Sequence, residues 1–520
     1  MVQQFDFLVI GSGIAGMSLA LKVADKGKVA IICKTELEEA NTYFAQGGIA
    51  SVTNLLVDNF DKHIEDTMIA GDWINDREAV EMVVRGAPDQ IKELISWGVN
   101  FDKKENGEFD LHREGGHSEF RILHHKDNTG AEIQLSLIEA IKRHPNITIF
   151  NHHFAVEIIT QHHLGIIVTR HTPGIKCYGA YVLNEDTGKV DTFLSKVTVM
   201  ATGGCEAVYR NTTNPLIATG DGIAMVYRAK GAVKNMEFIQ FHPTALFHPG
   251  DRPCFLITEA MRGEGARLLD EKGRAFMLRH DKRGDLAPRD VVAQAMMEEM
   301  LHSGAPCLFL DVSGVKQDLP TRFPTVFEQC REAGLDIRKE PIPVVPAAHY
   351  FCGGVLTDTR GRTSMRGLYA IGECACTGLH GANRLASTSL LEALVWGVSC
   401  GKDLARRAAS GGMPTGLAAA IPDWQHEGDE RHDDPALVAQ DWANIRNTMW
   451  NYVGISRTDA RLRRAFEDMR DLVRHIHDFY KRTRISRRLV DLFHGSQTAY
   501  VITQAAMRNP VSLGCHHRVD

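Results

Sequence analysis

The sequence predicts an α/β protein built on a dinucleotide-binding domain, which an inserted domain interrupts and a three-helix bundle follows. An apolar run near the N-terminus ends in a glycine triplet that opens a helix. The strand and helix pattern breaks after residue 232 and returns at 345, and residues beyond 425 keep helical spacing of apolar side chains. We therefore expect a discontinuous dinucleotide-binding domain over 1–232 and 345–408, an inserted domain over 233–344 and a helical domain over 425–520. Residues 409–433, rich in Gly, Pro and acidic side chains, are expected to link the last two.

Residues 5–16 read FDFLVIGSGIAG and have the order strand, glycine turn, helix. Gly11 would allow the tight turn, Gly13 would let a pyrophosphate approach the backbone, and Gly16 would let the helix pack on the strand. The free N–H groups and the positive end of the helix dipole would hold the phosphates. The predicted phosphate site comprises Gly11, Ser12, Gly13, Ile14, Ala15 and Gly16.

The residue type at the end of the second expected strand, residues 29–33, indicates which dinucleotide the fold binds. An NAD-binding fold usually carries an acidic residue there to bind a ribose. This chain has Lys34 instead, with Glu36 only beyond it, and contains no second GxGxxG motif. The pattern therefore disfavours a nicotinamide dinucleotide and leaves a flavin dinucleotide, whose phosphate or ribose Lys34 can meet.

Composition excludes several classes of function. The chain has 520 residues and a formal net charge of −6, so it lacks the basic surface typical of nucleic-acid binding. No apolar run reaches the length of a membrane span, and we expect no membrane partner. Eleven scattered cysteines suit a reducing cytoplasm. Histidine doublets occur without zinc spacing or an HExxH motif, and we expect no metal site.

Residues 41–50, NTYFAQGGIA, place two adjacent glycines in an apolar stretch, which indicates backbone pressed against something flat or bulky. This stretch resembles the flavin-contacting loop of the succinate dehydrogenase/fumarate reductase flavoprotein family, especially of its aspartate-oxidising members. In the respiratory members a histidine at the place of Asn41 carries FAD covalently, so the resemblance implies non-covalent FAD here. The cofactor-binding residues that it implies in this loop are Asn41, Thr42, Tyr43, Phe44, Ala45, Gln46, Gly47 and Gly48.

Further flavin motifs follow in the family's order. Residues 201–204, ATGG, and the last motif, GLYAIGE at 367–373, match those of two-dinucleotide-fold flavoproteins. The helix that opens after 380–391 would direct its start at the flavin N1/C2=O edge and stabilise the anionic reduced ring. The remaining cofactor-binding residues that the resemblance implies are Ala155, Val156, Asp221, Glu373, Ser389 and Leu390.

The inserted segment resembles the α+β capping domain of the same family, which makes the main domain an FAD-binding domain. Taken alone, the 113–118 loop, REGGHS, could be a solvated turn, and Glu259 with Arg262 an ordinary surface ion pair. Matching several motifs in family order favours a substrate site instead. The implied substrate-binding residues are Glu114, Gln240, His242, Thr258, Glu259, His349 and Arg384; Arg289 is the implied catalytic residue, and Glu259 and Arg262 its proton relay.

The resemblance implies oxidation of L-aspartate to iminoaspartate, with oxygen or fumarate as electron acceptor. This reaction would be the first step of NAD biosynthesis through quinolinate, with functional coupling to quinolinate synthase. The residues support it independently, because a small dicarboxylate needs cations at both ends and Arg384, His242 and His349 supply them. Two alternatives stay open: a soluble fumarate reductase or succinate dehydrogenase flavoprotein, and a flavin-binding protein without catalysis.

Overall fold

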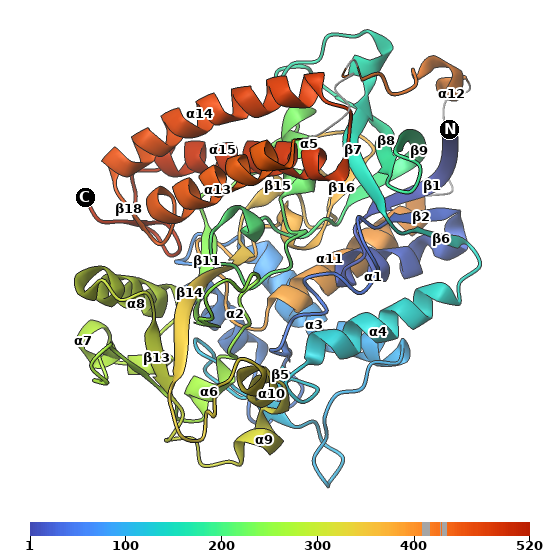
Figure 1. Cartoon of the computed structure of the whole chain (residues 1–520). Helices are drawn as coiled ribbons and strands as arrows, with labels where there is room; N and C mark the ends of the chain where they lie inside the picture. The colour runs from blue at the N-terminus through green and yellow to red at the C-terminus, as the bar shows by residue number, and fades with distance from the viewer. Residues whose placement is uncertain (408–415, 427, 429–433) are drawn as a thin grey trace.

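The computed structural model describes residues 1–407, 416–426, 428 and 434–520. Its largest sheet has seven strands and lies on the right-hand side of the view in Figure 1. The strand order is β6–β2–β1–β9–β8–β7, and β16 also pairs with β9. The first four strands and β16 run parallel, whereas β8 is antiparallel to both of its neighbours. The strands are β1 (Val2–Ile10), β2 (Val29–Ile32), β6 (Ile147–Phe150), β7 (His153–Thr160), β8 (Cys177–Asn184), β9 (Lys189–Met200) and β16 (Leu368–Ala370).

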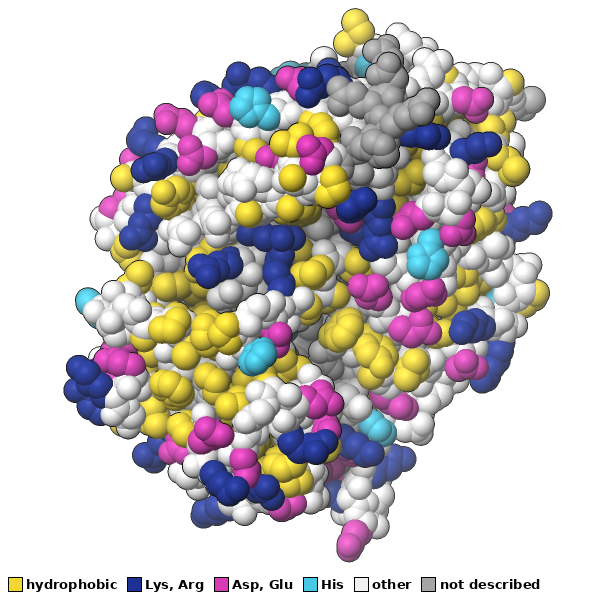
Figure 2. Space-filling view, viewed as in Figure 1, with side chains coloured by type: hydrophobic (Ala, Val, Ile, Leu, Met, Phe, Trp, Pro, Cys, Tyr) yellow, Lys and Arg dark blue, Asp and Glu magenta, His cyan; other side chains and the backbone are white. Residues whose placement is uncertain are grey.

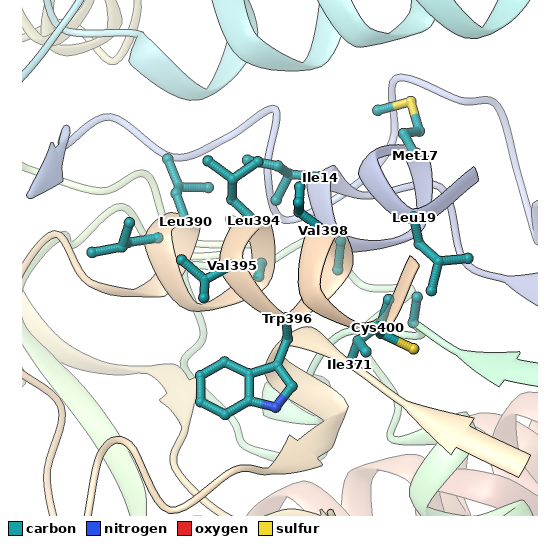
Figure 3. Packing of buried hydrophobic residues seen from close by; sticks show 14 of the residues in the cluster. Ile14, Met17, Leu19, Ile371, Leu390, Leu394, Val395, Trp396, Val398 and Cys400 are labelled. Atoms are coloured by element: carbon teal, nitrogen blue, oxygen red, sulfur yellow. The ribbon is translucent and has the colours of Figure 1, made fainter. Parts of the chain in front are cut away.

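Helices α1 (Ile14–Val23) and α11 (Ser389–Arg407) pack against each other beside this sheet (Figure 3). Their apolar side chains, among them Ile14, Leu19, Leu394 and Val398, form one buried cluster. A Cβ atom at Gly397 would lie 2.7 Å from the Ala15 carbonyl oxygen, so the close approach of the two helices requires glycine there. Helices α2 (Phe60–Ala70), α3 (Arg77–Ser96) and α4 (Thr129–Lys142) add to the same cluster, and Asp76 caps α3 as predicted.

The inserted segment forms a second sheet, of order β11–β14–β13–β12, with short helices around it. Strand β14 (Ile342–Phe351) runs across the predicted boundary at 344–345, and the boundary itself stays a prediction. The other strands are β11 (Ile239–Leu246), β12 (Arg267–Leu269) and β13 (Leu308–Asp311). The helices are α6 (Ala260–Gly263), α7 (Met277–His280), α8 (Arg289–Ser303), α9 (Leu319–Arg322) and α10 (Pro324–Glu332).

Helices α13 (Pro435–Tyr452), α14 (Asp459–Arg482) and α15 (Arg487–Arg508) form the C-terminal bundle, so the predicted three-helix bundle is confirmed. Asp434 caps α13 through the Ala436 amide, and Pro435 occupies the first turn. Helix α15 packs on α5 (Asp221–Arg228), which joins the bundle to the main domain. Much of the predicted linker (residues 409–415, 427 and 429–433) lies outside the described residues, and α12 (Leu417–Ala420) falls within the rest of it.

Three small sheets complete the fold. The sheet β3–β5–β4 is antiparallel and carries the REGGHS loop directly after β4. Its strands are β3 (Ile49–Ala50), β5 (Ile122–Leu123) and β4 (Leu111–His112). The other two sheets comprise β10 (Val233–Lys234), β15 (Gly354–Leu356) and β17 (Ala375–Cys376), and β18 (Ser456–Arg457) with β19 (His517–Arg518).

The surface carries charges of both signs. Figure 2 shows Lys and Arg interspersed with Asp and Glu over the visible face, which fits the nearly balanced composition. Within the described ranges, no helix is both long and apolar enough to cross a bilayer. Searching the same residues finds no group of three or more His, Cys, Asp or Glu side chains that could hold a metal ion.

Leu394 tests the packing between α1 and α11. Its side chain is fully buried in the shared cluster, whereas that of Leu56 is 95% exposed. We expect Leu394→Ala to lower the free energy of unfolding by about 2–5 kcal/mol, because it removes apolar contacts and leaves a cavity. The matched control Leu56→Ala should stay within about 0.5 kcal/mol of the unmodified protein. Urea denaturation followed by circular dichroism measures both, and equal stability of the two variants would contradict the packing described.

Candidate functional site

A long cavity runs along the carboxyl ends of the parallel strands, where open α/β sheets bind their ligands. Five segments that are distant in sequence form its walls: the N-terminal glycine motif, the 41–45 loop, the ATGG segment, the start of α5 and the start of α11. Of the predicted cofactor residues, those that line it are Gly11, Ser12, Gly13, Ile14, Ala15, Lys34, Asn41, Thr42, Phe44, Ala45, Ala155, Asp221, Glu373, Ser389 and Leu390.

At the glycine motif, just before the start of α1, the backbone of Gly11 lies directly against the backbone of Ala201. Gly11 has a φ of +118°, and a Cβ atom there would lie 2.0 Å from the Ala201 carbonyl oxygen. A Cβ atom at Gly16 would lie 2.3 Å from the Gly11 oxygen, so Gly16 serves packing behind the cavity wall. The N-terminus of α1 faces the cavity, and the helix dipole favours an anionic group there.

The 41–48 loop joins the cavity to the REGGHS loop. The Asn41 side-chain amide donates to Glu373 Oε2 at 2.8 Å, and Thr42 Oγ1 accepts from the Ile14 amide at 3.1 Å. Gly47 and Gly48 lie behind the wall, and a Cβ atom at Gly48 would be 2.1 Å from the Leu123 oxygen. The other predicted residues of the loop also lie off the cavity wall: Tyr43, whose ring packs on Phe44, and the buried Gln46.

The far end of the cavity depends on the C-terminal bundle. Lys34 Nζ lies 2.9 Å from Asp221 Oδ2 and 2.5 Å from Asp491 Oδ1 of α15, so two carboxylates hold an ammonium that we expected to meet phosphate or ribose. Burial alone would lower the pKa of Lys34, but the two carboxylates raise it. His494 lies 3.2 Å from Asp221, and Val156, behind the wall, accepts through its carbonyl from Arg228. Asp491 and His494 were absent from the sequence prediction.

Two buried guanidinium groups converge on one amide oxygen beyond the other end of the cavity. Gln240 Oε1 accepts from an Arg384 amine at 2.9 Å and from an Arg289 amine at 3.3 Å. The Gln240 amine in turn donates to Asn383 Oδ1 at 2.6 Å and to the Arg384 carbonyl at 2.8 Å. Strand β11, the start of α8 and the 380–388 segment thereby meet at a single side chain.

Arg384 is the less compensated of the two cations. Its side chain is buried and, in the described part of the chain, forms no ion pair, and its Nε has no hydrogen-bond partner there. Tyr350 lies beneath it, with the guanidinium carbon 4.5 Å from the ring centroid. The Tyr350 hydroxyl bonds the buried carboxylate of Glu392, which also lies 3.0 Å from His380 Nε2. A buried cation without a carboxylate partner is a binding site for an anion.

His242 and His349 stand side by side, with ring centroids 5.1 Å apart. Burial, followed by the charge of Arg289, holds the pKa of each imidazole well below its usual range. His242 Nδ1 accepts from the Thr244 amide, which leaves Nε2–H as a buried donor without a partner among the described residues. His349 Nδ1 lies 2.8 Å from Thr213 Oγ1, a partner that the sequence prediction missed although the TTNP run follows the ATGG motif.

Glu259 bridges the two arginines of the inserted domain. Its Oε2 lies 2.6 Å from Arg289 Nε, and its Oε1 lies 3.5 Å from Arg262. All three side chains are buried, so the predicted pair is not a surface ion pair. Thr258 immediately precedes them and is buried as well. Arg289 contacts Glu259, and Glu259 contacts Arg262. These three side chains therefore form a continuous chain of ion pairs that leads from the convergent cations into the inserted domain.

Glu114 faces this group from the REGGHS loop. Its Oε2 accepts from Ser387 Oγ at 2.6 Å, and a Cβ atom at the neighbouring Gly115 would lie 2.4 Å from Glu259 Oε1. Burial alone would raise the pKa of Glu114, but His112 and Arg289 lower it to about 2. The carboxylate therefore stays ionised at neutral pH among these buried side chains. We call this group the chamber; its members are Glu114, Gln240, His242, Glu259, Arg289, His349 and Arg384.

Buried ion pairs and hydrogen bonds fix the loop that carries Glu114. Arg121, fully buried, pairs with Asp58 at 2.8 Å and also with Asp66, which accepts from the Ser118 amide. His117 Nε2 lies 2.9 Å from the Ala386 carbonyl, so the loop is tied to the segment that carries Arg384. The chamber thus combines cations, an imidazole donor and one opposed carboxylate, which suits a small molecule with anionic ends and a cationic group.

The chain is similar over most of its length to known flavoproteins. The FAD binding domain family matches residues 6–390. L-aspartate oxidase of Yersinia pestis is 46% identical over 99% of this chain and 96% of its own length, and that of Pseudomonas aeruginosa is 45% identical over 99% and 95%. Among solved structures, a point variant of quinol fumarate reductase FrdA from E. coli has a TM-score of 0.87 and 30% identity, covering all of this chain and 92% of that one.

The cofactor is FAD, and the residues present fit it. Both the glycine motif and the start of α11 line the cavity. A flavin dinucleotide requires two such places, one for its phosphates and one for its flavin ring. The backbone contact at Gly11 leaves no room for a side chain, and the start of α1 supplies a phosphate site. The matched fold class, an FAD-binding domain with an inserted α+β domain and a helical bundle, is confirmed.

We expect FAD to be held without a covalent bond. Asn41 stands where the respiratory members of the resembled family have the histidine that carries FAD, and its side-chain amide donates to Glu373 instead of forming a bond to the flavin. Acid precipitation of the purified protein should therefore leave the yellow colour in the supernatant. Flavin that stays with the pellet, and runs with the protein on a denaturing gel, would contradict the expectation.

Proposed function

The chain belongs to the L-aspartate oxidase family of FAD-binding proteins, and on that premise we propose that it oxidises L-aspartate to iminoaspartate. One observation carries the choice of substrate: the ionised carboxylate of Glu114 is buried in the same chamber as the convergent cations Arg289 and Arg384. Aspartate has two carboxylates and, at neutral pH, one ammonium group. A chamber with two convergent cations and one carboxylate matches that set of charges.

Each group of the chamber has a role in this proposal. Arg384 and His242 bind substrate carboxylates, because Nε of Arg384 and Nε2 of His242 are buried and lack a hydrogen-bond partner in the described part of the chain. Glu114 pairs with the ammonium group. Succinate in the same place would leave Glu114 buried and unpaired among further carboxylates, which costs on the order of a few kcal/mol. The same carboxylate therefore attracts aspartate and disfavours succinate.

The chemistry divides between cofactor and protein. FAD, when bound, accepts a hydride from the substrate Cα. Loss of that hydride and of one ammonium proton converts the CH–NH3+ group into C=NH2+, and Glu114 is placed to take the proton. In the reverse sense, on fumarate, Arg289 donates a proton to carbon and regains it through Glu259 and Arg262. An arginine is protonated at ordinary pH, so Arg289 holds the proton that it donates. Glu259, whose Oε2 lies 2.6 Å from Arg289 Nε, is placed to return a proton to it afterwards.

The finer parts of the proposal concern the acceptor and the cellular setting. Fumarate as electron acceptor is supported by the similarity to quinol fumarate reductase, and oxygen is proposed as a second acceptor. Iminoaspartate would pass to quinolinate synthase as the first step of NAD biosynthesis. All eleven cysteines are unpaired and buried, which fits the reducing cytoplasm that we propose as the location.

The alternative, a fumarate reductase or succinate dehydrogenase flavoprotein, is favoured by the shared fold and the shared cations. Two residues argue against it. Asn41 replaces the histidine to which the respiratory members attach FAD, and Glu114 adds a buried negative charge that succinate does not need. The arrangement of Arg289, Glu259 and Arg262 argues against a flavin-binding protein without catalysis.

Glu114→Gln tests the assignment of the substrate. The variant keeps a side chain of the same shape beside Ser387 but removes the charge that pairs with the ammonium. We expect kcat/KM for L-aspartate to fall about 100-fold or more, while fumarate reduction is retained or improved. Glu119→Gln, a half-buried glutamate of the same loop region paired with Lys62, is the matched control and should change neither. Equal losses on both substrates would mean that Glu114 only supports its loop.

Arg289→Leu tests the proton donor. Turnover of fumarate should fall about 100-fold or more, because the variant lacks the proposed proton donor, and the flavin absorbance spectrum should be kept. Arg283→Leu is the control, since Arg283 lies in the same segment but pairs with Asp281 at the surface. Dye-linked fumarate reduction measures both variants. A rate for Arg289→Leu equal to that of the unmodified enzyme would refute the role.

A further inference from the structure

A line of ionisable side chains leads from Glu114 towards the surface, away from the FAD cavity. Glu114 Oε1 lies 3.6 Å from His112 Nε2, and the rings of His112 and His124 have centroids 4.8 Å apart. His124 Nδ1 lies 3.3 Å from Asp102 Oδ2, and its Nε2 lies 3.6 Å from Asp110 Oδ2. The side chains of Glu114, His112 and His124 are 2%, 15% and 4% exposed, and those of the two aspartates at the outer end are 32% (Asp102) and 50% (Asp110) exposed.

The small sheet β3–β5–β4 fixes this order. His112 ends β4 and pairs in register with Ile122 of β5, and His124 follows β5 directly. Glu114 comes two residues after His112 and enters the chamber. The Asp102 amide donates to the His124 carbonyl at 2.8 Å, and the Asp110 amide to the Asp102 carbonyl at 2.9 Å. The two imidazoles are therefore held next to each other by backbone pairing, with a carboxylate at either end.

His112 lacks the contacts of a structural histidine. Its side chain is 15% exposed, yet neither ring nitrogen hydrogen-bonds to any residue that the structure describes. A buried polar group placed only for packing is normally satisfied, since leaving it unpaired costs free energy. The ring instead lies between two exchangeable groups, with Nε2 3.6 Å from Glu114 Oε1 and its centroid 4.8 Å from that of His124.

The proposed reaction creates a need for such a route. Each aspartate oxidised releases one ammonium proton into a buried chamber, where Glu114 is the carboxylate placed to accept it. We propose that His112 and His124 carry this proton from Glu114 to Asp102 and Asp110 at the surface. The N–H bond of the substrate breaks as an O–H bond forms on Glu114, and the proton then passes to each imidazole in turn, with no change of oxidation state. The inference rests on the proposed function, since fumarate reduction releases no such proton.

The charges around Glu114 favour the first outward step, and those around His124 leave it as a neutral imidazole. Glu114 faces His112, His117 and Arg289, and its pKa of about 2 means that it does not retain the proton. His124 faces His112, Asp102, Asp110 and Arg322. Burial, followed by the charge of His112, lowers the pKa of His124, so this imidazole is neutral near pH 7 and can accept. An imidazole is the side chain that ordinarily exchanges protons in this range of pH.

His112→Gln in the holoenzyme tests the route. Anaerobic rapid mixing with L-aspartate, followed by the loss of flavin absorbance, should show reduction slowed by about tenfold or more. Dye-linked fumarate reduction and the dissociation constant of succinate should be unchanged. Added imidazole should restore part of the rate. The wild-type rate should fall at low pH, where protonated imidazoles no longer accept a proton, and this fall should be lost in the variant. His144→Gln is the matched control, because that ring lies 3.2 Å from Asp25 Oδ1 and is not part of the line.

Each outcome decides the proposal. A His112→Gln rate with aspartate equal to that of the wild type overturns the route while leaving the proposed function intact. Equal slowing with aspartate and fumarate, without rescue by imidazole, also overturns it, because a disturbed loop would act on both substrates. Wild-type enzyme whose flavin L-aspartate fails to reduce would overturn the proposed function and the route together.

Discussion

The amide oxygen of Gln240 is the point on which the chamber depends, because two buried guanidinium groups donate to it. Like charges held this close in a buried site repel strongly, and only neighbouring groups can keep them there. Glu259 compensates Arg289 directly. Arg384 receives weaker compensation from the Tyr350 ring, which is itself fixed by Glu392 and His380. The cost of assembling the two cations is thus distributed over β11, α8 and the 380–392 segment, and an anionic ligand offsets it.

The same constraint explains the form of the inserted domain. Its sheet brings Gln240 and His242 on β11 next to His349 on β14, although about 100 residues separate the two strands. The antiparallel pairing of β11 with β14 sets the spacing between the imidazoles and the arginines. The chamber therefore lies at the junction of the inserted and main domains, and its cations come from both.

Local patterns predicted the parts of the site that local geometry determines. The Gly11 motif is set by the steric needs of a strand, a turn and a helix, so both the cavity and the place of α1 followed from a short stretch of sequence. The C-terminal helices followed from apolar spacing in the same way. No local sequence pattern indicates which residues, far apart in the chain, contact each other in the fold. Nothing near Lys34 indicates that Asp491 holds its ammonium, and nothing near Glu114 indicates that His112 and His124 continue outward from it.

The contact between Lys34 and Asp491 also bears on how the protein matures. The glycine motif leaves the ribosome before α15 (Arg487–Arg508), about 470 residues further along the chain. Domains generally fold as they emerge. The wall of the cavity that includes Lys34 and Asp221 gains its second carboxylate and His494 only when α15 has docked on α5. Capture of the dinucleotide in its final environment is consequently a step that follows the synthesis of α15.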